Sequence, residues 1–138
     1  MQSAYLATCL VGAAIVASFV LAPDSVAQDA TGVWVNPPEA CDTVFTRSGG
    51  QIDFSPRADF YGSGFIIKGN VIRGKMATCK VQKTTRQGNI VTITATCATD
   101  VMVGDSTFQL KVDDHNTLVR IVPGSPELDT KYVRCPTK

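Results

Sequence analysis

Residues 77–98 read ATCKVQKTTRQGNIVTITATCA, a stretch that predicts a β-hairpin. In its second half, apolar residues alternate with threonine from Val91 to Cys97, the pattern of a strand with one buried and one solvated face. Gln87-Gly88-Asn89 separates the two halves and has the composition of a tight turn. We therefore expect two antiparallel strands, at 77–84 and 90–98.

This hairpin predicts a partner for two of the cysteines. If Gln87-Gly88-Asn89 is a three-residue loop, Arg86 lies opposite Ile90. Cys79 then lies opposite Cys97, because each is seven residues from that first pair. Opposed residues have Cα atoms about 4.5–5.5 Å apart, which a disulfide can bridge. A loop one residue longer or shorter would put the two cysteines on opposite faces.

The remaining cysteines extend this prediction. Of the cysteines at 9, 41, 79, 97 and 135, the first lies in an apolar N-terminal stretch, and the other four indicate two disulfides formed in an oxidising compartment. If Cys79 pairs with Cys97, Cys41 is left for Cys135, which joins the start of the domain to its end. Closing so long a loop destabilises the unfolded chain by on the order of 4–5 kcal/mol. The other two connectivities stay open.

The N-terminal stretch has the features of an export signal. No residue from Ala4 to Ala22 is charged, and Ser25-Val26-Ala27 has the small-x-small form of a signal-peptidase site. We expect residues 1–27 to be a cleaved signal peptide and residues 28–138 to form a single β domain, periplasmic or secreted. The alternative is an uncleaved anchor, because about 19 apolar residues can span a bilayer.

The charge of the expected domain is close to neutral. It keeps all 13 Lys and Arg against 11 acidic residues (12 less Asp24), a net charge of +2. This balance argues against nucleic acid or an anionic membrane surface as partner.

Short β segments separated by Gly, Asn and Asp continue through the domain, and no window of 11 residues has a helical apolar period. The expected strands are 32–35, 43–47, 51–55, 64–68, 71–75, 77–84, 90–98, 107–112, 117–122 and 131–135. So many short strands in one small domain favour an all-β fold, an antiparallel β-barrel of about eight strands, with a β-sandwich as the alternative.

Gly32-Val33-Trp34, which opens the first expected strand, resembles the start of lipocalin-type barrels. The resemblance implies that Trp34 closes one end of the barrel and that a basic residue of a late strand stacks on its ring. Arg134, or else Arg120, is in place for this cation–π contact. Alternatively, Trp34 is simply the largest core side chain.

Residues 59–65 read DFYGSGF and are a candidate binding loop. Glycine lets a backbone approach a partner closely, and aromatic side chains provide contact area. The candidate binding residues are Asp59, Phe60, Tyr61, Ser63 and Phe65. The alternative is a flexible connection whose Phe60 and Phe65 point into the core.

Signals for catalysis are weak. His115 is the single histidine, and Asp113-Asp114-His115-Asn116 has the composition of a hairpin turn rather than of a metal site. Asp53 and Asp59 could supply two-carboxylate chemistry, but nothing in their surroundings predicts a raised pKa. A nucleophile elbow, a phosphate-binding loop, a Cys-x-x-Cys pair and a calcium loop are all absent from the sequence. We therefore expect no catalytic residue, no metal and no cofactor.

Short motifs are distributed along the domain: Ala40-Cys41, Gly62-Ser63-Gly64-Phe65-Ile66-Ile67, Ile72-Arg73-Gly74-Lys75, Ala77-Thr78-Cys79, Cys97-Ala98-Thr99-Asp100 and Tyr132-x-Arg134-Cys135. Through them the chain, from Trp34 to Cys135, resembles a group of small exported proteins of alphaproteobacteria. The resemblance implies a bacterial periplasmic protein and supplies no catalytic residues.

Taken together, the sequence favours a non-enzymatic envelope protein that binds a small apolar ligand or another envelope protein. We expect a monomer that contacts neither nucleic acid nor, after signal cleavage, the membrane. The alternatives are a structural envelope protein without a pocket, a lysozyme-inhibitor-like protein or a small hydrolase. The barrel interior separates these functions: a hollow interior favours a ligand-binding protein, a packed interior favours a protein without a pocket, and a polar lining favours a hydrolase.

Overall fold

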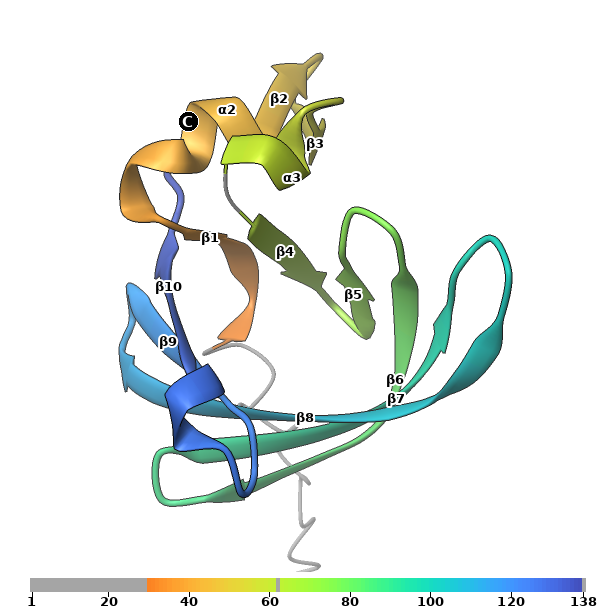
Figure 1. The fold of residues 1–138 in the computed structure, drawn as a ribbon, viewed down its shortest axis with the longest axis vertical. Helices are drawn as coiled ribbons and strands as arrows, with labels where there is room; N and C mark the ends of the chain where they lie inside the picture. Colours follow the sequence, from red (N-terminus) through yellow and green to blue (C-terminus); the bar gives the residue numbers. More distant parts are fainter. Residues whose placement is uncertain (1–29, 62, 138) are drawn as a thin grey trace, which may run out of the picture.

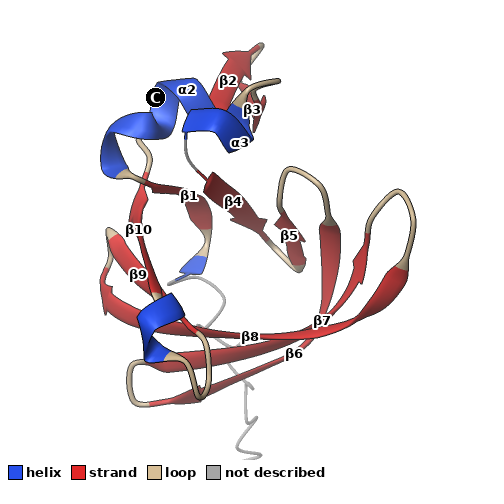
Figure 2. Ribbon diagram, viewed as in Figure 1, coloured by secondary structure: helices blue, strands red, loops and turns tan. Residues whose placement is uncertain are grey.

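Eight strands close into an antiparallel barrel in the computed structural model, which describes residues 30–61 and 63–137 (Figures 1 and 2). The barrel strands are β1 (Gly32–Asn36), β4 (Ser63–Lys68), β5 (Val71–Arg73), β6 (Thr78–Gln87), β7 (Ile90–Ala98), β8 (Val103–Asp114), β9 (Thr117–Ile121) and β10 (Thr130–Arg134). Their order around the barrel is β1-β10-β9-β8-β7-β6-β5-β4, and β4 pairs again with β1. The barrel is confirmed, and the sandwich is excluded.

Between β1 and β4 the chain leaves the barrel and forms a small cap, residues 37–61. The cap consists of η1 (Pro38–Ala40), α2 (Cys41–Val44), the hairpin of β2 (Phe45–Ser48) and β3 (Gln51–Phe54), and α3 (Ala58–Tyr61). Figure 1 shows these elements gathered beside the C-terminus, over the side of the barrel that β1 and β4 form. A short η2 (Pro126–Leu128) connects β9 to β10. Within the described ranges, no helix is long and apolar enough to cross a membrane.

Several strand boundaries differ from the expectation, including that of β6, which continues to Gln87 rather than ending at residue 84. The expected strand at 43–47 begins as helix, because Pro38 starts a helical turn and Val44 is buried in the cap. β5 ends at Arg73 rather than at residue 75, because a turn closes there with a hydrogen bond from the Gly74 N–H to the Ala77 carbonyl. β8 is longer than the expected 107–112 and runs over the full side of the barrel.

The β6–β7 hairpin has the expected cysteine pair but not the expected turn. Gln87 pairs with Ile90, so the loop is Gly88-Asn89 alone, one residue shorter than expected. A β-bulge between Val81 and Lys83 shifts the register back by one residue. Cys79 therefore still lies opposite Cys97. The pairing was right, while the expected loop was wrong.

The structure contains two disulfides, Cys79–Cys97 and Cys41–Cys135, in the expected connectivity. The first joins neighbouring strands inside the barrel, with its Cα atoms 3.9 Å apart. The second joins α2 of the cap to the residue after β10, with its Cα atoms 5.8 Å apart. Two disulfides in so small a domain indicate a non-cytoplasmic environment, since cytoplasmic thiols are kept reduced. The expected signal peptide, residues 1–27, lies outside the described residues.

Two hydrophobic cores share the wall formed by β1 and β4. Trp34 points into the barrel, while its neighbours Val33 and Val35 point outwards and are buried beneath the cap. The inner core also contains Val91, Ile93, Ala95, Leu110, Leu118 and Tyr132, and the outer core contains Val44, Phe45, Ala58, Ile66 and Cys135. The cap therefore packs on the outside of the barrel and leaves the interior to the barrel's own side chains.

Candidate functional site

The end of the barrel at the start of β1 is sealed by Trp34, which is fully buried. Its indole Nε1 donates a hydrogen bond of 2.9 Å to the Ala30 carbonyl, and the Arg134 guanidinium carbon lies 4.3 Å from the ring centroid. Arg134 also donates to the carbonyls of Thr31 and His115. Burial lowers the pKa of Arg134 by desolvation, but a guanidinium stays charged in proteins. This end is a packed structural plug.

Gly32 completes the plug by leaving room for Arg134. A Cβ at this position would overlap the Arg134 guanidinium, and the φ of 150° is one that other residues rarely adopt. Arg134 is thus the basic residue on Trp34, whereas Arg120 lies over the Phe108 ring, 5.9 Å from its centroid.

The opposite half of the barrel interior contains a cavity of about 270 Å³. Its lining comes from six strands and the β5–β6 turn: Ser63, Gly64, Phe65, Ile67, Ile72, Gly74, Ala77, Cys79, Phe108, Leu110, Arg120 and Tyr132. Gly32, at the plugged end of β1, pairs with Ile67, whereas Asn36, at the other end of β1, pairs with Ser63. The rim of the cavity at Ser63 is therefore at the end of the barrel away from the Trp34 plug. The barrel is therefore packed at one end and hollow at the other.

The walls of this cavity are mostly apolar. Phe65 and Tyr132 meet edge to face, with ring centroids 4.9 Å apart, and Cys79, in its disulfide with Cys97, lines the cavity from β6. Arg120 is the single charged residue of the lining. The interior thus offers an apolar surface with one cation at its mouth.

The segment 59–65 is not the irregular loop expected from its composition. Asp59, Phe60 and Tyr61 belong to α3, and Ser63 begins β4. Ser55 stabilises the turn that leads into α3, because its hydroxyl accepts a hydrogen bond of 3.2 Å from the Arg57 N–H. Ser63 and Phe65 line the cavity, whereas the Asp59 side chain lies in the cap, exposed to solvent. The side chains of Phe60 and Tyr61 lie outside the described part of the structure.

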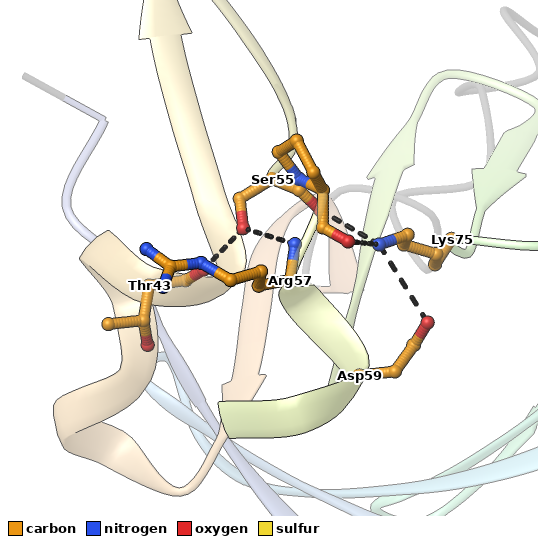
Figure 3. A network of polar contacts seen from close by, with 6 residues as sticks. Thr43, Ser55, Arg57, Asp59 and Lys75 are labelled. Carbon is orange, nitrogen blue, oxygen red and sulfur yellow. Dashed lines mark hydrogen bonds and ion pairs between the residues drawn. The ribbon is translucent and has the colours of Figure 1, made fainter.

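Lys75, in the β5–β6 turn, joins the rim of the barrel to the cap (Figure 3). Its ammonium donates to the carbonyls of Ser55, at 2.9 Å, and Pro56, at 2.7 Å, and lies 3.8 Å from an Asp59 carboxylate oxygen. The Ser55 hydroxyl donates in turn to the Thr43 carbonyl at 2.6 Å. Sequence reasoning missed this network, because its acceptors are backbone carbonyls that no residue pattern identifies. These contacts fix the cap on the barrel.

The other candidate residues have structural roles. Asp53 accepts hydrogen bonds from the Phe54 N–H and from Arg73, and these two contacts hold the pKa of Asp53 below its usual value. A carboxylate held ionised in this way does not suit a general acid. His115 lies exposed in the β8–β9 turn, where its carbonyl accepts from Arg134. Within residues 30–61 and 63–137, no three His, Cys, Asp or Glu side chains are grouped to hold a metal ion.

No protein-family model, no curated protein and no solved structure matches this chain. The resemblance to small exported proteins of alphaproteobacteria and that to lipocalin-type barrels both stay predictions.

Proposed function

We propose that the protein is a periplasmic or secreted binding protein, not an enzyme, that holds a small and largely apolar molecule in the open half of its barrel. The observation that carries the proposal is the cavity of about 270 Å³ with apolar walls. Small-molecule sites are concave and mostly apolar, and they occur at the mouths of β-barrels. A dry apolar cavity of about 150 Å³ already accepts benzene. The cavity of this barrel has nearly twice that volume and therefore suits a ligand larger than benzene.

The polar groups around the cavity also favour binding over catalysis. The described lining includes Ser63 and Tyr132 but neither a histidine nor a carboxylate, so Ser63 has no base beside it among the lining residues. Cys79 is in a disulfide and is not available as a nucleophile. We infer that the cavity holds its ligand without transforming it.

Exposed apolar residues at the rim favour a second candidate function, binding of an envelope protein. Met76 is in the β5–β6 turn, and Val101, Met102 and Val103 are at the β7–β8 turn; all four side chains are at least 64% exposed. Exposed apolar side chains that gather in one place often mark an interaction surface. Such a protein would bind at the rim and not in the cavity.

A matched pair of variants distinguishes the two candidates. Ala77→Phe places a ring at the cavity wall, and Ala98→Phe places the same ring on an exposed strand residue that does not line the cavity. Native mass spectrometry after mild purification is expected to show a retained ligand on the wild type and on Ala98→Phe. Ala77→Phe should give the bare protein mass, with circular dichroism showing that it is folded. Equal retention by the two variants would contradict a ligand in the cavity.

A further inference from the structure

We propose that the ligand of this cavity is an anionic amphiphile: an apolar body that enters the barrel and a terminal carboxylate that Arg120 binds at the mouth. This inference rests on the proposed function, because it names the class of molecule that the cavity selects.

Arg120 is placed on the inner side of the barrel wall. Leu118, two residues earlier on β9, is fully buried inside the barrel, and alternate residues of a strand point to the same side. Arg120 pairs with Leu110 of β8 and Thr130 of β10, lines the cavity and remains exposed. The guanidinium thus lies where the apolar interior opens to solvent, with Phe108 beneath it.

The charge of Arg120 is not neutralised within the described part of the chain. The ion pairs found there are Arg73–Asp53, Lys75–Asp59 and Lys111–Asp113, and the contact seen for Arg120 is the Phe108 ring. No Asp or Glu is among the described residues that line the cavity. Arg134, at the other end of the same interior, instead has two carbonyl acceptors and the Trp34 ring. One arginine is built into the fold, and the other is available to a ligand.

The shape of the barrel determines which way such a ligand points. Because the Trp34 plug closes the far end, a molecule enters through the Ser63 rim and leaves its last group there, beside Arg120. A guanidinium binds a carboxylate with two parallel hydrogen bonds, and such charge-assisted bonds are about twice as strong as neutral ones. An apolar chain with a carboxylate end would pack its chain against the apolar walls and bind its carboxylate to Arg120 at the mouth.

Calorimetric titration with octanoate, 1-octanol and octylamine tests the inference on the wild type, Arg120→Gln and the control Arg86→Gln. The control removes the same charge near the end of β6, at a residue that does not line the cavity. We expect the wild type and the control to bind octanoate about tenfold or more tightly than 1-octanol, and octylamine least. Arg120→Gln should lose this preference and keep the 1-octanol affinity.

The outcomes distinguish the anionic class of ligand from the proposed binding function itself. If the wild type binds 1-octanol as tightly as octanoate, or if Arg120→Gln keeps the preference, the anionic class is wrong while the binding function stands. If none of the three compounds binds the wild type, the proposed function fails, and this inference fails with it.

Discussion

Replacing Gly32 by alanine tests how the sealed end of the barrel is built. The new methyl group would overlap the Arg134 guanidinium, which must then leave the Thr31 carbonyl and shift on the Trp34 ring. A hydrogen bond from a charged donor contributes about 1.5–3 kcal/mol, and a cation–π contact contributes about 0.5–2 kcal/mol. With strain from the φ of 150°, we expect Gly32→Ala to lower the free energy of unfolding by about 3 kcal/mol.

Urea unfolding followed by tryptophan fluorescence measures this loss directly, because Trp34 is the single tryptophan and lies at the perturbed site. Gly69→Ala is the control, since Gly69 has a φ of 58° but open space around it; we expect about 1 kcal/mol there. In an Arg134→Ala background, Gly32→Ala should cost at least about 1 kcal/mol less, because the overlap is gone. Equal costs in the two backgrounds would refute the account of Gly32 as room for Arg134.

Three further predictions concern the remaining contacts of the fold. Removing the Cys41–Cys135 bond by double alanine replacement should cost about 4.7 kcal/mol and removing Cys79–Cys97 about 3 kcal/mol, from loops of 94 and 18 residues; the reverse order in chemical denaturation would contradict loop closure as the main term. The folded-state pKa of Asp53 is lowered, so its stabilisation is full above the usual value of 3.8 and is lost as the pH falls below it. Asp53→Asn should therefore be less stable than the wild type at pH 7, with the difference shrinking below pH 3.8 in acid unfolding curves; a constant difference would contradict the role of the carboxylate. Lys75→Met removes the donor to the Ser55 and Pro56 carbonyls, so hydrogen exchange should become faster in residues 55–61 and not in β7; unchanged exchange would show that the cap is held without Lys75.

The fold could be predicted from alternation and turn residues, because a strand that buries one face has a period of two that is visible in a single sequence. The expected strand at 90–98 is β7 without change, and the contact of Arg134 with Trp34 is the one implied by the resemblance of Gly32-Val33-Trp34 to lipocalin-type barrels. The cap helices could not be predicted, since α2 and α3 have four residues each, too few to show a helical period.

The hairpin shows how a correct pairing can follow from an incomplete reason. The expected three-residue loop and the observed two-residue loop with a bulge after Val81 give the same partners for Cys79, because one missing loop residue is offset by one extra strand residue. A sequence contains no strong signal for such a bulge.

The candidate site was the part that sequence reasoning located least well. Its residues come from six strands, and the hollow exists because the side chains at the Ser63 end of the interior do not fill it. That is a property of packing in three dimensions, which neither residue type nor spacing expresses. The place of Arg120 was open to partial prediction, since it shares the parity of the buried Leu118 along β9.

The most direct test of the binding function is a nuclear magnetic resonance titration of the full domain with the neutral probe 1-octanol. We predict saturable shifts at the lining residues Phe65, Leu110 and Tyr132, and their loss in Ala77→Phe. Shifts confined to the exposed rim at Val101 and Met102, or no saturable shift at all, would contradict a ligand site inside the barrel.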